Sequence, residues 1–316
     1  MTRYLASLLL IFMLASTIMA DRFSVEKESD KVTVNLDGKL FTEYLIKSGA
    51  KPVLWPVIGP NGEPITRGYP MREVSPDEKD DHVHHRSFWF THGAVNDTSF
   101  WHEGGDSTGN IVHREFLTVE DGDEAVIETK NDWVDRHGDV ICHDVRKLTF
   151  GVTGDSRFID FDITLTAGDK PVTFGDTKEG SFGVRVAGTM RVNADKGGKI
   201  VNSHGQENKD AWGKQAPWVD YSGPAGDDIV GIAILNHPKS FRYPSHWHVR
   251  TYGLFAANVF GLHDFKGDSS INASHTLQPG ESMTFYYRVL LHPGDVKGGK
   301  VAEAFEEYSK TEKASK

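Results

Sequence analysis

The sequence predicts an all-β protein, a large antiparallel β-sandwich with long loops and a C-terminal helix. Polar and apolar residues alternate along eight segments, which is the pattern of strands with one face in a core. Turn dipeptides separate several of these segments. No strand-helix-strand rhythm appears along the chain, and this argues against a parallel α/β architecture.

The clearest strands lie in the middle and near the end of the chain. Phe161, Ile163 and Leu165 alternate with polar residues, and so do Phe285 and Tyr287. The eight expected strands cover residues 31–36, 40–46, 125–134, 140–150, 158–165, 182–187, 229–235 and 283–291. The turn dipeptides are Asp37-Gly38, Asp121-Gly122, His137-Gly138 and Gly154-Asp155.

The remaining elements are one helix and two long loops. Val301, Ala304, Phe305 and Tyr308 recur at helical spacing, which predicts a C-terminal helix of about 12 to 15 residues. Residues 52–81 and 202–226 carry no clear periodicity. Loops this long inside a domain are usually functional, so we expect them to form walls of a site.

The N-terminus has the pattern of a secretory signal peptide. Arg3 precedes an apolar run that ends at Met19, and Ala20 stands at a plausible cleavage position. The run is shorter than the ~20 residues of a membrane span. We therefore expect residues 1–20 to be a signal peptide, residues 21–316 to be a single β-sandwich domain, and the protein to be exported to the periplasm or outside the cell.

Composition narrows the class of protein further. The 316 residues are 38% hydrophobic and 25% charged, which is typical of a globular protein rather than a disordered one. The net charge of −10 argues against a nucleic acid partner, because phosphate binding needs a basic surface. The single cysteine, Cys142, cannot form an intramolecular disulfide, and its apolar neighbours predict a buried residue.

A histidine-rich segment is the strongest candidate for a site. Its histidines are His82, His84, His85, His92, His102 and His113, accompanied by Trp89 and Trp101. One interpretation is acid-base chemistry on a polar, hydroxylated ligand, because histidine titrates near neutral pH. At least half of these histidines are expected simply to bind loop backbone.

The other interpretation of this segment is a metal site. Two histidines two residues apart share a face of a strand and can reach one ion. The candidate ligands are Asp81, His82, His84 and His92. The spacing matches no strong metal-binding motif, so a divalent metal is an alternative and no cofactor is assigned.

A second cluster spans residues 246–252. On an extended chain His246, His248, Arg250 and Tyr252 project to one face, and Trp247 projects to the opposite face. Such a basic and aromatic face fits the floor of a pocket for an anionic or hydroxyl-rich ligand. A solvated edge strand is the alternative.

One carboxylate lies between the two clusters. Glu179 stands where a loop enters a strand, next to Gly180, and Arg185 follows in that strand. A carboxylate there can serve as a general base opposite a histidine acid. A surface glutamate in a turn is the ordinary alternative.

Four motifs together resemble the exported bacterial family often labelled "methane oxygenase PmoA". They are Arg67-Gly68-Tyr69-Pro70, the run from Asp81 to Gly93, the stretch from Glu179 to Arg185, and the run from Trp247 to Asn258. The name implies an integral membrane oxygenase. No apolar run after residue 20 is long enough to span a membrane, and the mean hydropathy is −0.43, so we expect the label to be a misnomer.

The architecture is also similar to the galactose-mutarotase-like supersandwich. That resemblance implies arginine and histidine side chains from a broad concave sheet, with a carboxylate opposite, arranged around a sugar. Residues of these types here are Arg67, His84, His85, Glu179, His248 and Arg250. A shared fold alone does not imply a shared function.

These observations lead to one main hypothesis and two alternatives. The main hypothesis is an exported carbohydrate-active protein that binds a sugar or uronate and performs epimerase, lyase or hydrolase chemistry. The alternatives are a histidine and aspartate metalloprotein with redox activity, and a non-catalytic glycan-binding module. In all three, the ligand is a small molecule or glycan, and no membrane contact is expected after signal removal.

The main hypothesis assigns specific roles. His85 or His248 is the general acid and Glu179 the base. The predicted substrate-binding residues are Arg67, His84, Arg86, Trp89, Arg185, His246, Trp247, Arg250 and Tyr252. The hypothesis requires residues 82–92, 179–185 and 246–252 to meet in one pocket.

Overall fold

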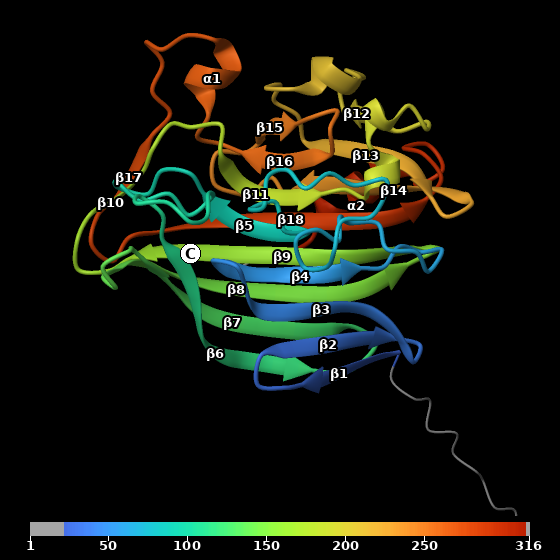
Figure 1. Ribbon diagram of the computed structural model, residues 1–316, viewed down its shortest axis with the longest axis horizontal. Helices are drawn as coiled ribbons and strands as arrows, with labels where there is room; N and C mark the ends of the chain where they lie inside the picture. Colours follow the sequence, from blue (N-terminus) through green and yellow to red (C-terminus); the bar gives the residue numbers. More distant parts are fainter. Residues whose placement is uncertain (1–21, 314–316) are drawn as a thin grey trace, which may run out of the picture.

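Two antiparallel sheets of eight strands each form the protein in a computed structural model, which describes residues 22–313 (Figure 1). The predicted signal peptide therefore lies outside the described residues. The first sheet has the order β1-β2-β3-β4-β5-β11-β16-β15. Its strands are β1 (Phe23–Lys27), β2 (Lys31–Leu36), β3 (Lys39–Ser48), β4 (Lys51–Val57), β5 (Phe88–His92), β11 (Gly180–Arg185), β16 (Leu254–Asn258) and β15 (His246–Val249).

The second sheet has the order β12-β13-β14-β18-β9-β8-β7-β6. Its strands are β12 (Lys199–Asn202), β13 (Trp218–Ala225), β14 (Asp228–Asn236), β18 (Ser282–Pro293), β9 (Ser156–Ala167), β8 (Val140–Thr153), β7 (Ala125–Val134) and β6 (Asn110–Glu120). A small sheet pairs β10 (Val172–Phe174) with β17 (His275–Leu277). The all-β antiparallel sandwich is thus confirmed.

The helices are few and short. They are α1 (Leu262–Lys266), α2 (Val301–Tyr308) and three 3₁₀ turns at Gly188–Met190, Val192–Ala194 and Asn208–Ala211. Between residues 22 and 313, no helix has the length and apolar character needed to cross a membrane. The C-terminal helix is confirmed in position, but it has eight residues, fewer than expected.

The main core lies between the two sheets and follows from the alternation seen in the sequence. Phe161, Ile163 and Leu165 of β9 are buried in it, as are Phe285 and Tyr287 of β18. β9 and β18 pair with each other over ten successive residues. The period of two therefore places one face of each long strand in the core and the other face outside.

The prediction that residues 52–81 and 202–226 form loops is partly wrong, because each segment contains a strand. β4 begins at Lys51, and its burial does not alternate, so it lacks the period-two signal. β13 begins at Trp218, and its first six residues are all buried. Strands covered on both faces show continuous burial and escape a search for alternation.

The outer face of the first sheet positions the candidate site. Phe88 and Phe90 of β5 enter the main core, whereas Trp89 between them joins a separate cluster on the opposite face. Gly183 of β11 pairs with Trp89, and a Cβ at Gly183 would lie 2.6 Å from the indole ring. Glycine at this position lets the indole approach the backbone of the neighbouring strand closely.

Candidate functional site

A pocket of about 220 Å³ collects side chains from the three segments that the sequence singled out. The lining residues are His82, His84, His85, Trp101, His102, Lys178, Glu179, His248, Arg250, Tyr252 and Leu254. The segments lie far apart in the sequence, and sheet pairing brings them together, because β11 lies between β5 and β16, and β16 pairs with β15. The required convergence is therefore present.

Arg67 holds the histidine-bearing loop in place. The guanidinium is buried and donates to the carbonyl oxygens of Asp81, His82 and His85 at 2.8 to 3.0 Å. It also donates to Asp81 Oδ1 at 3.0 Å. Since an arginine has five N–H donors in a rigid fork, one side chain can fix several carbonyls at once. Arg67 therefore acts on the pocket through the loop backbone.

His85 lies at the centre of a stack of four rings. Its ring is parallel to Trp89 on one side, with centroids 5.5 Å apart, and to His82 on the other at 4.8 Å. His82 in turn stacks on Tyr252 at 5.4 Å. Nη1 of Arg185 lies 2.9 Å from Nδ1 of His85. Because arginine can only donate, Nδ1 accepts, and the proton of the neutral ring is on Nε2.

The protonation of His85 follows from its surroundings. Burial, and then the positive charge of Arg185, hold the pKa of His85 well below its ordinary value. The ring is therefore neutral near neutral pH, with its N–H on Nε2. It can donate a hydrogen bond there, but it is not a charged imidazolium.

Two further histidines form the adjacent wall. The ring centroid of His84 lies 5.0 Å from that of His102 and 4.5 Å from that of His85. Burial lowers the pKa of His84 to about 3, and the charge of nearby Lys51 acts in the same direction. Lys51 is itself fully buried and forms an ion pair with Glu103 at 2.8 Å.

Glu179 is the carboxylate of the pocket. It accepts hydrogen bonds from Thr177 Oγ1 at 2.7 Å and pairs with Lys178 Nζ at 3.0 Å. Desolvation works to raise the pKa of this carboxyl, but the hydrogen bonds and the ammonium charge outweigh it and lower the pKa. Glu179 is therefore ionised near neutral pH and can accept a proton.

Arg250 is the arginine whose side chain lines the pocket. Its guanidinium lies 5.7 Å from the ring centroid of Trp212 and 5.7 Å from that of Tyr252. Among residues 22–313, Arg250 makes no ion pair. An arginine packed near two aromatic rings keeps its donors available for a carboxylate or phosphate.

His248 projects from β15 into the same pocket. It is 5% exposed, and burial lowers the pKa of its ring to about 4. Its Nδ1 is buried and has no hydrogen-bond partner within the described part of the chain. Phe265 of α1 packs against the ring of His248 with centroids 6.3 Å apart. A buried polar atom left without a partner is a reason to expect a ligand.

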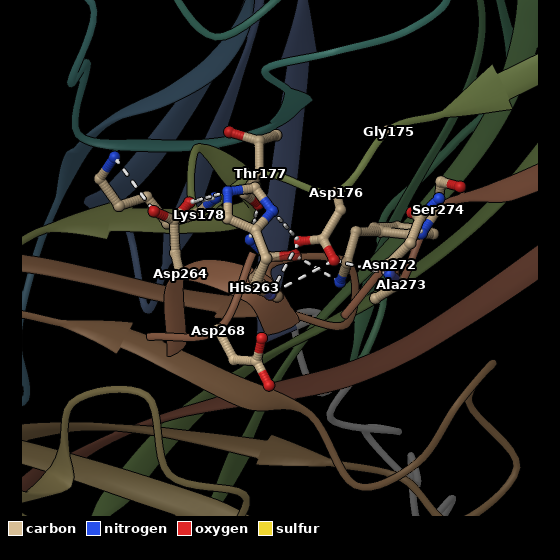
Figure 2. Close-up of polar contacts among 12 residues, drawn as sticks. Gly175, Asp176, Thr177, Lys178, His263, Asp264, Asp268, Asn272, Ala273 and Ser274 are labelled. Carbon is tan, nitrogen blue, oxygen red and sulfur yellow. Dashed lines mark hydrogen bonds and ion pairs between the residues drawn. The ribbon is translucent and has the colours of Figure 1, made fainter. Parts of the chain in front are cut away.

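A polar cluster lies between α1 and the segment of Lys178, which lines the pocket (Figure 2). Asp176, only 6% exposed, pairs with Nδ1 of His263 at 2.9 Å and accepts from the backbone N–H of Ala273 at 2.6 Å. Nε2 of His263 lies 3.3 Å from Asp264, which accepts from the backbone N–H of Lys178. The cluster thereby links α1 to the segment that carries Lys178 and Glu179.

Several predicted substrate-binding residues support the pocket without lining it. Trp89 and Trp247 are fully buried, and Trp247 donates to the carbonyl of Ala216 in the main core. Arg86 is bound to Glu103 at 2.8 to 3.1 Å. The remaining three are Arg67 and Arg185, which hold the 81–85 loop, and His246, which stacks on Phe265 outside the pocket.

The predicted metal set is not brought together. His82 and His84 lie at the pocket, and Asp81 lies beside His82, but His92 points to the core face of β5. There Nε2 of His92 bonds the carbonyl of Gly175 at 2.8 Å and Nδ1 bonds Ser181 at 3.3 Å. In residues 22–313, no group of three or more histidine, cysteine or acidic side chains is placed to hold a metal ion.

Four lining residues were not assigned to the site from the sequence. Trp101 and His102 belong to the histidine-rich segment, and Lys178 immediately precedes Glu179, so their neighbourhood was a usable signal. Leu254 gives no such signal, because an apolar strand residue is normally a core residue.

Comparisons with known proteins place the chain in a family but identify no activity. Similar solved structures include a polysaccharide lyase, with 14% identity, 91% of this chain and 34% of that chain covered, and a TM-score of 0.36. Another is the GH36 α-galactosidase AgaB from Geobacillus stearothermophilus, with 10% identity, coverage of 86% and 41%, and a TM-score of 0.42. The chain thus spans less than half the length of either enzyme.

A third similar structure is a galactose mutarotase-like protein from Clostridium acetobutylicum, with 10% identity, coverage of 87% and 99%, and a TM-score of 0.38. Similarities this distant carry no information about substrate. No curated protein matches the chain. None of these similarities bears on the PmoA label, so that resemblance stays a prediction. The model of a family of unknown function, DUF6807, matches residues 31–306, and the chain therefore belongs to the DUF6807 family.

Proposed function

We propose that this protein is an exported carbohydrate-active enzyme that binds an acidic sugar of the uronate type and transfers protons on it. The observation that carries the proposal is a single pocket holding one ionised carboxylate, neutral histidines and an arginine that makes no ion pair with residues 22–313. Perturbed titratable groups gathered in a cavity are typical of catalytic sites.

Arg250 is the group that favours an acidic ligand. A guanidinium binds a carboxylate with two parallel hydrogen bonds, and here no acidic side chain of residues 22–313 competes for it. Lys178 adds a second positive charge at the same pocket, although Glu179 partly neutralises it. The flat rings of Tyr252 and Trp101 suit the apolar faces of a sugar.

The acid-base groups divide into an acceptor and two donors. Glu179 is ionised and accepts a proton, whereas His85 is neutral and offers its Nε2 proton as a hydrogen bond. A sugar carbon next to a carboxylate loses its proton to Glu179, and the electron pair moves into the carboxylate held by Arg250. In elimination the pair then returns to form a carbon–carbon double bond, the C–O bond of the adjacent carbon breaks, and the leaving oxygen takes the proton back from Glu179. His248, with Nδ1 unpartnered, is the candidate to bond a hydroxyl or leaving oxygen.

The composition of the pocket favours epimerisation or elimination over hydrolysis. Most glycoside hydrolases use two carboxylates that face each other across the scissile bond. Among the residues that line this pocket, Glu179 is the one carboxylate. Asp81 lies nearby, but Arg67 and Arg185 both bind its Oδ1. Proton abstraction needs one base and one stabilised anion, which this set supplies.

The test is turnover of a panel of aldoses, uronates and acidic oligosaccharides, followed by proton NMR in deuterium oxide. Epimerisation or elimination exchanges or removes a carbon-bound proton, and elimination also produces an ultraviolet-absorbing double bond. We expect a uronate or uronate-containing glycan to react. Reaction of neutral aldoses alone would overturn the acidic substrate class.

Variants assign the roles. Glu179→Gln and His85→Asn are expected to lower kcat/KM by about 100-fold or more, which is the usual size of an acid-base contribution. Glu207→Gln and His137→Asn are matched controls on exposed residues outside the pocket and are expected to keep full activity. Unchanged activity in Glu179→Gln would remove the proposed base, and saturable binding without turnover across the panel would favour a glycan-binding module.

A further inference from the structure

A second pocket adjoins the first and has no role in the chemistry described above. It has a volume of about 270 Å³ and is lined by Lys209, Trp212, Val249, Arg250 and Thr251. Its walls come from the 3₁₀ turn at Asn208–Ala211 and from the residues at the end of β15. Lys209 is exposed and makes no ion pair with any residue in the described range. The second pocket therefore also has an uncompensated positive charge.

Arg250 is common to both pockets. Its guanidinium lies near Trp212, which lines the second pocket, and near Tyr252, which lines the first. The ring of His248 in the first pocket also lies edge-on to Trp212, with centroids 6.3 Å apart. A ligand group bound by Arg250 consequently sits at the junction of the two pockets.

Unsatisfied polar atoms lie at this junction. Nε1 of Trp212 and Nδ1 of His248 are both buried, and neither has a hydrogen-bond partner in the described part of the protein. A buried polar atom without a partner is unfavourable, so two of them on rings that contact each other indicate a polar ligand. His248 is 5% exposed, which makes it a built part of the protein rather than a mobile surface group.

The volumes of the two pockets also favour a single ligand that fills both of them. Ligand pockets usually enclose ~300–1,000 Å³. The first pocket at about 220 Å³ and the second at about 270 Å³ each fall short of that range, whereas the two combined fall within it. A ligand that fills both is longer than one sugar ring.

We propose that the two pockets are adjacent subsites for an acidic oligosaccharide of at least two sugar units, joined at Arg250. The reacting uronate occupies the pocket of Glu179 and His85, and the next unit lies against the ring of Trp212 with its polar groups toward Lys209. This inference rests on the proposed function and adds the length of the substrate. Stacking of a sugar face on an indole and a lysine at the far end give the second subsite its affinity.

The test measures binding by calorimetry for glucuronate and galacturonate and for a disaccharide and trisaccharide of each. We expect the disaccharide to bind at least about 10-fold more tightly than its monosaccharide, with little further gain for the trisaccharide. Lys209→Ala is expected to reduce this gain and to leave monosaccharide binding unchanged. Trp212→Phe is also expected to reduce the gain. Lys214→Ala, an exposed lysine that lines neither pocket, is the control and is expected to behave as wild type.

The outcomes separate the two proposals. Monosaccharide binding with no gain for the disaccharide would overturn the second subsite and leave the proposed function intact. A gain that survives both Lys209→Ala and Trp212→Phe would place the second unit elsewhere and also overturn it. Absence of binding for every acidic sugar and oligosaccharide would overturn the proposed function, and the second subsite with it.

Discussion

Nη1 of Arg185 donates a hydrogen bond to Nδ1 of His85 across 2.9 Å, and both side chains are only 2% exposed. The bond fixes the neutral tautomer of His85 with its proton on Nε2. The same guanidinium binds Asp81 at 3.0 Å and lies 4.8 Å from the ring centroid of Tyr252. One buried arginine thereby orients three groups around the pocket without lining it.

Arg185→Met is expected to raise the pKa of His85 toward its ordinary value. Burial is the first cause of the lowered pKa and stays in place, but the repulsion by the guanidinium charge is removed. The loss of partners for His85 and Asp81 is expected to destabilise the protein by about 1–3 kcal/mol. NMR titration of the His85 ring measures the first effect and urea unfolding the second. An unchanged pKa of His85 in this variant would contradict the electrostatic role.

Stability is expected to fall as the pH drops from about 6.5 to about 4. Burial lowers the pKa of His92 and of His248 to about 4 in the folded protein. In the unfolded chain each ring binds a proton near pH 6.5, so between these values the unfolded state holds more protons and is favoured as the pH falls. Above about pH 6.5 these two rings add no pH dependence.

His92 offers the cleaner measurement of this effect, because it is completely buried and lies outside the pocket. A pKa of about 4 in the folded protein, against about 6.5 in the unfolded chain, corresponds to a contribution on the order of 3 kcal/mol. Urea unfolding between about pH 4 and pH 6.5 should show this decrease in the free energy of unfolding. His92→Gln should make the free energy of unfolding less dependent on pH while lowering it near neutral pH. An equally steep curve in His92→Gln would show that other groups dominate.

The sequence was sufficient to predict the long strands and to predict which side chains of residues 246–252 share a face. Both predictions follow from the alternation of side chains along an extended chain. Trp247 and Val249 enter the main core, whereas His248 lines the pocket. The expected side for Arg250 and Tyr252 is also confirmed, although both lie beyond the end of β15. A turn closed by the bond from Gly253 N–H to the carbonyl of Arg250 follows the strand.

Other features depend on contacts between distant segments and were not accessible from local pattern. Four arginines were predicted to bind substrate. Arg67, Arg86 and Arg185 each form an ion pair with an acidic side chain, whereas Arg250 forms none with residues 22–313. Which arginine remains free depends on where Asp81 and Glu103 lie in space. The position of His92 is a similar case, because it belongs to the histidine-rich segment but falls on the core face of β5.

Glu103→Gln is expected to destabilise the protein by about 3–5 kcal/mol, because it leaves a buried cation without its partner. Glu103 binds Lys51 at 2.8 Å and Arg86 at 2.8 to 3.1 Å, and Lys51 is fully buried with its pKa lowered to about 8. Urea unfolding measures the loss. The control is Lys196→Ala, which breaks an exposed ion pair with Asp77 and should cost less than about 1 kcal/mol. Equal losses in the two variants would contradict the importance of burial.

Asp176→Asn is expected to loosen α1 and the adjoining segment of Lys178, which lines the pocket. The carboxylate binds the His263 ring and the backbone N–H of Ala273, and an amide cannot reproduce both contacts with the same charge (Figure 2). We expect faster hydrogen exchange across residues 262–274 and a loss of stability of about 1–3 kcal/mol. Asp268→Asn is the control, since within residues 22–313 the carboxylate of Asp268 bonds only the nearby Ser270 and the residue is exposed. Similar exchange in both variants would show that Asp176 does not anchor the segment.

Arg250→Gln is expected to weaken binding of an acidic sugar without harming the fold. The guanidinium makes no ion pair with residues 22–313 and contacts two aromatic rings, so its loss should change the free energy of unfolding by no more than about 1 kcal/mol. Loss of a hydrogen-bonded charge pair with the ligand carboxylate should cost about 2–5 kcal/mol of binding free energy. That is about a 30-fold or larger rise in Kd by calorimetry. Arg191→Gln is the matched control, because Arg191 binds the carbonyls of Gly188 and Asp77 outside the pocket and should leave Kd unchanged. If Arg250→Gln bound the acidic sugar as tightly as wild type, the carboxylate would have to be held by Lys178 instead.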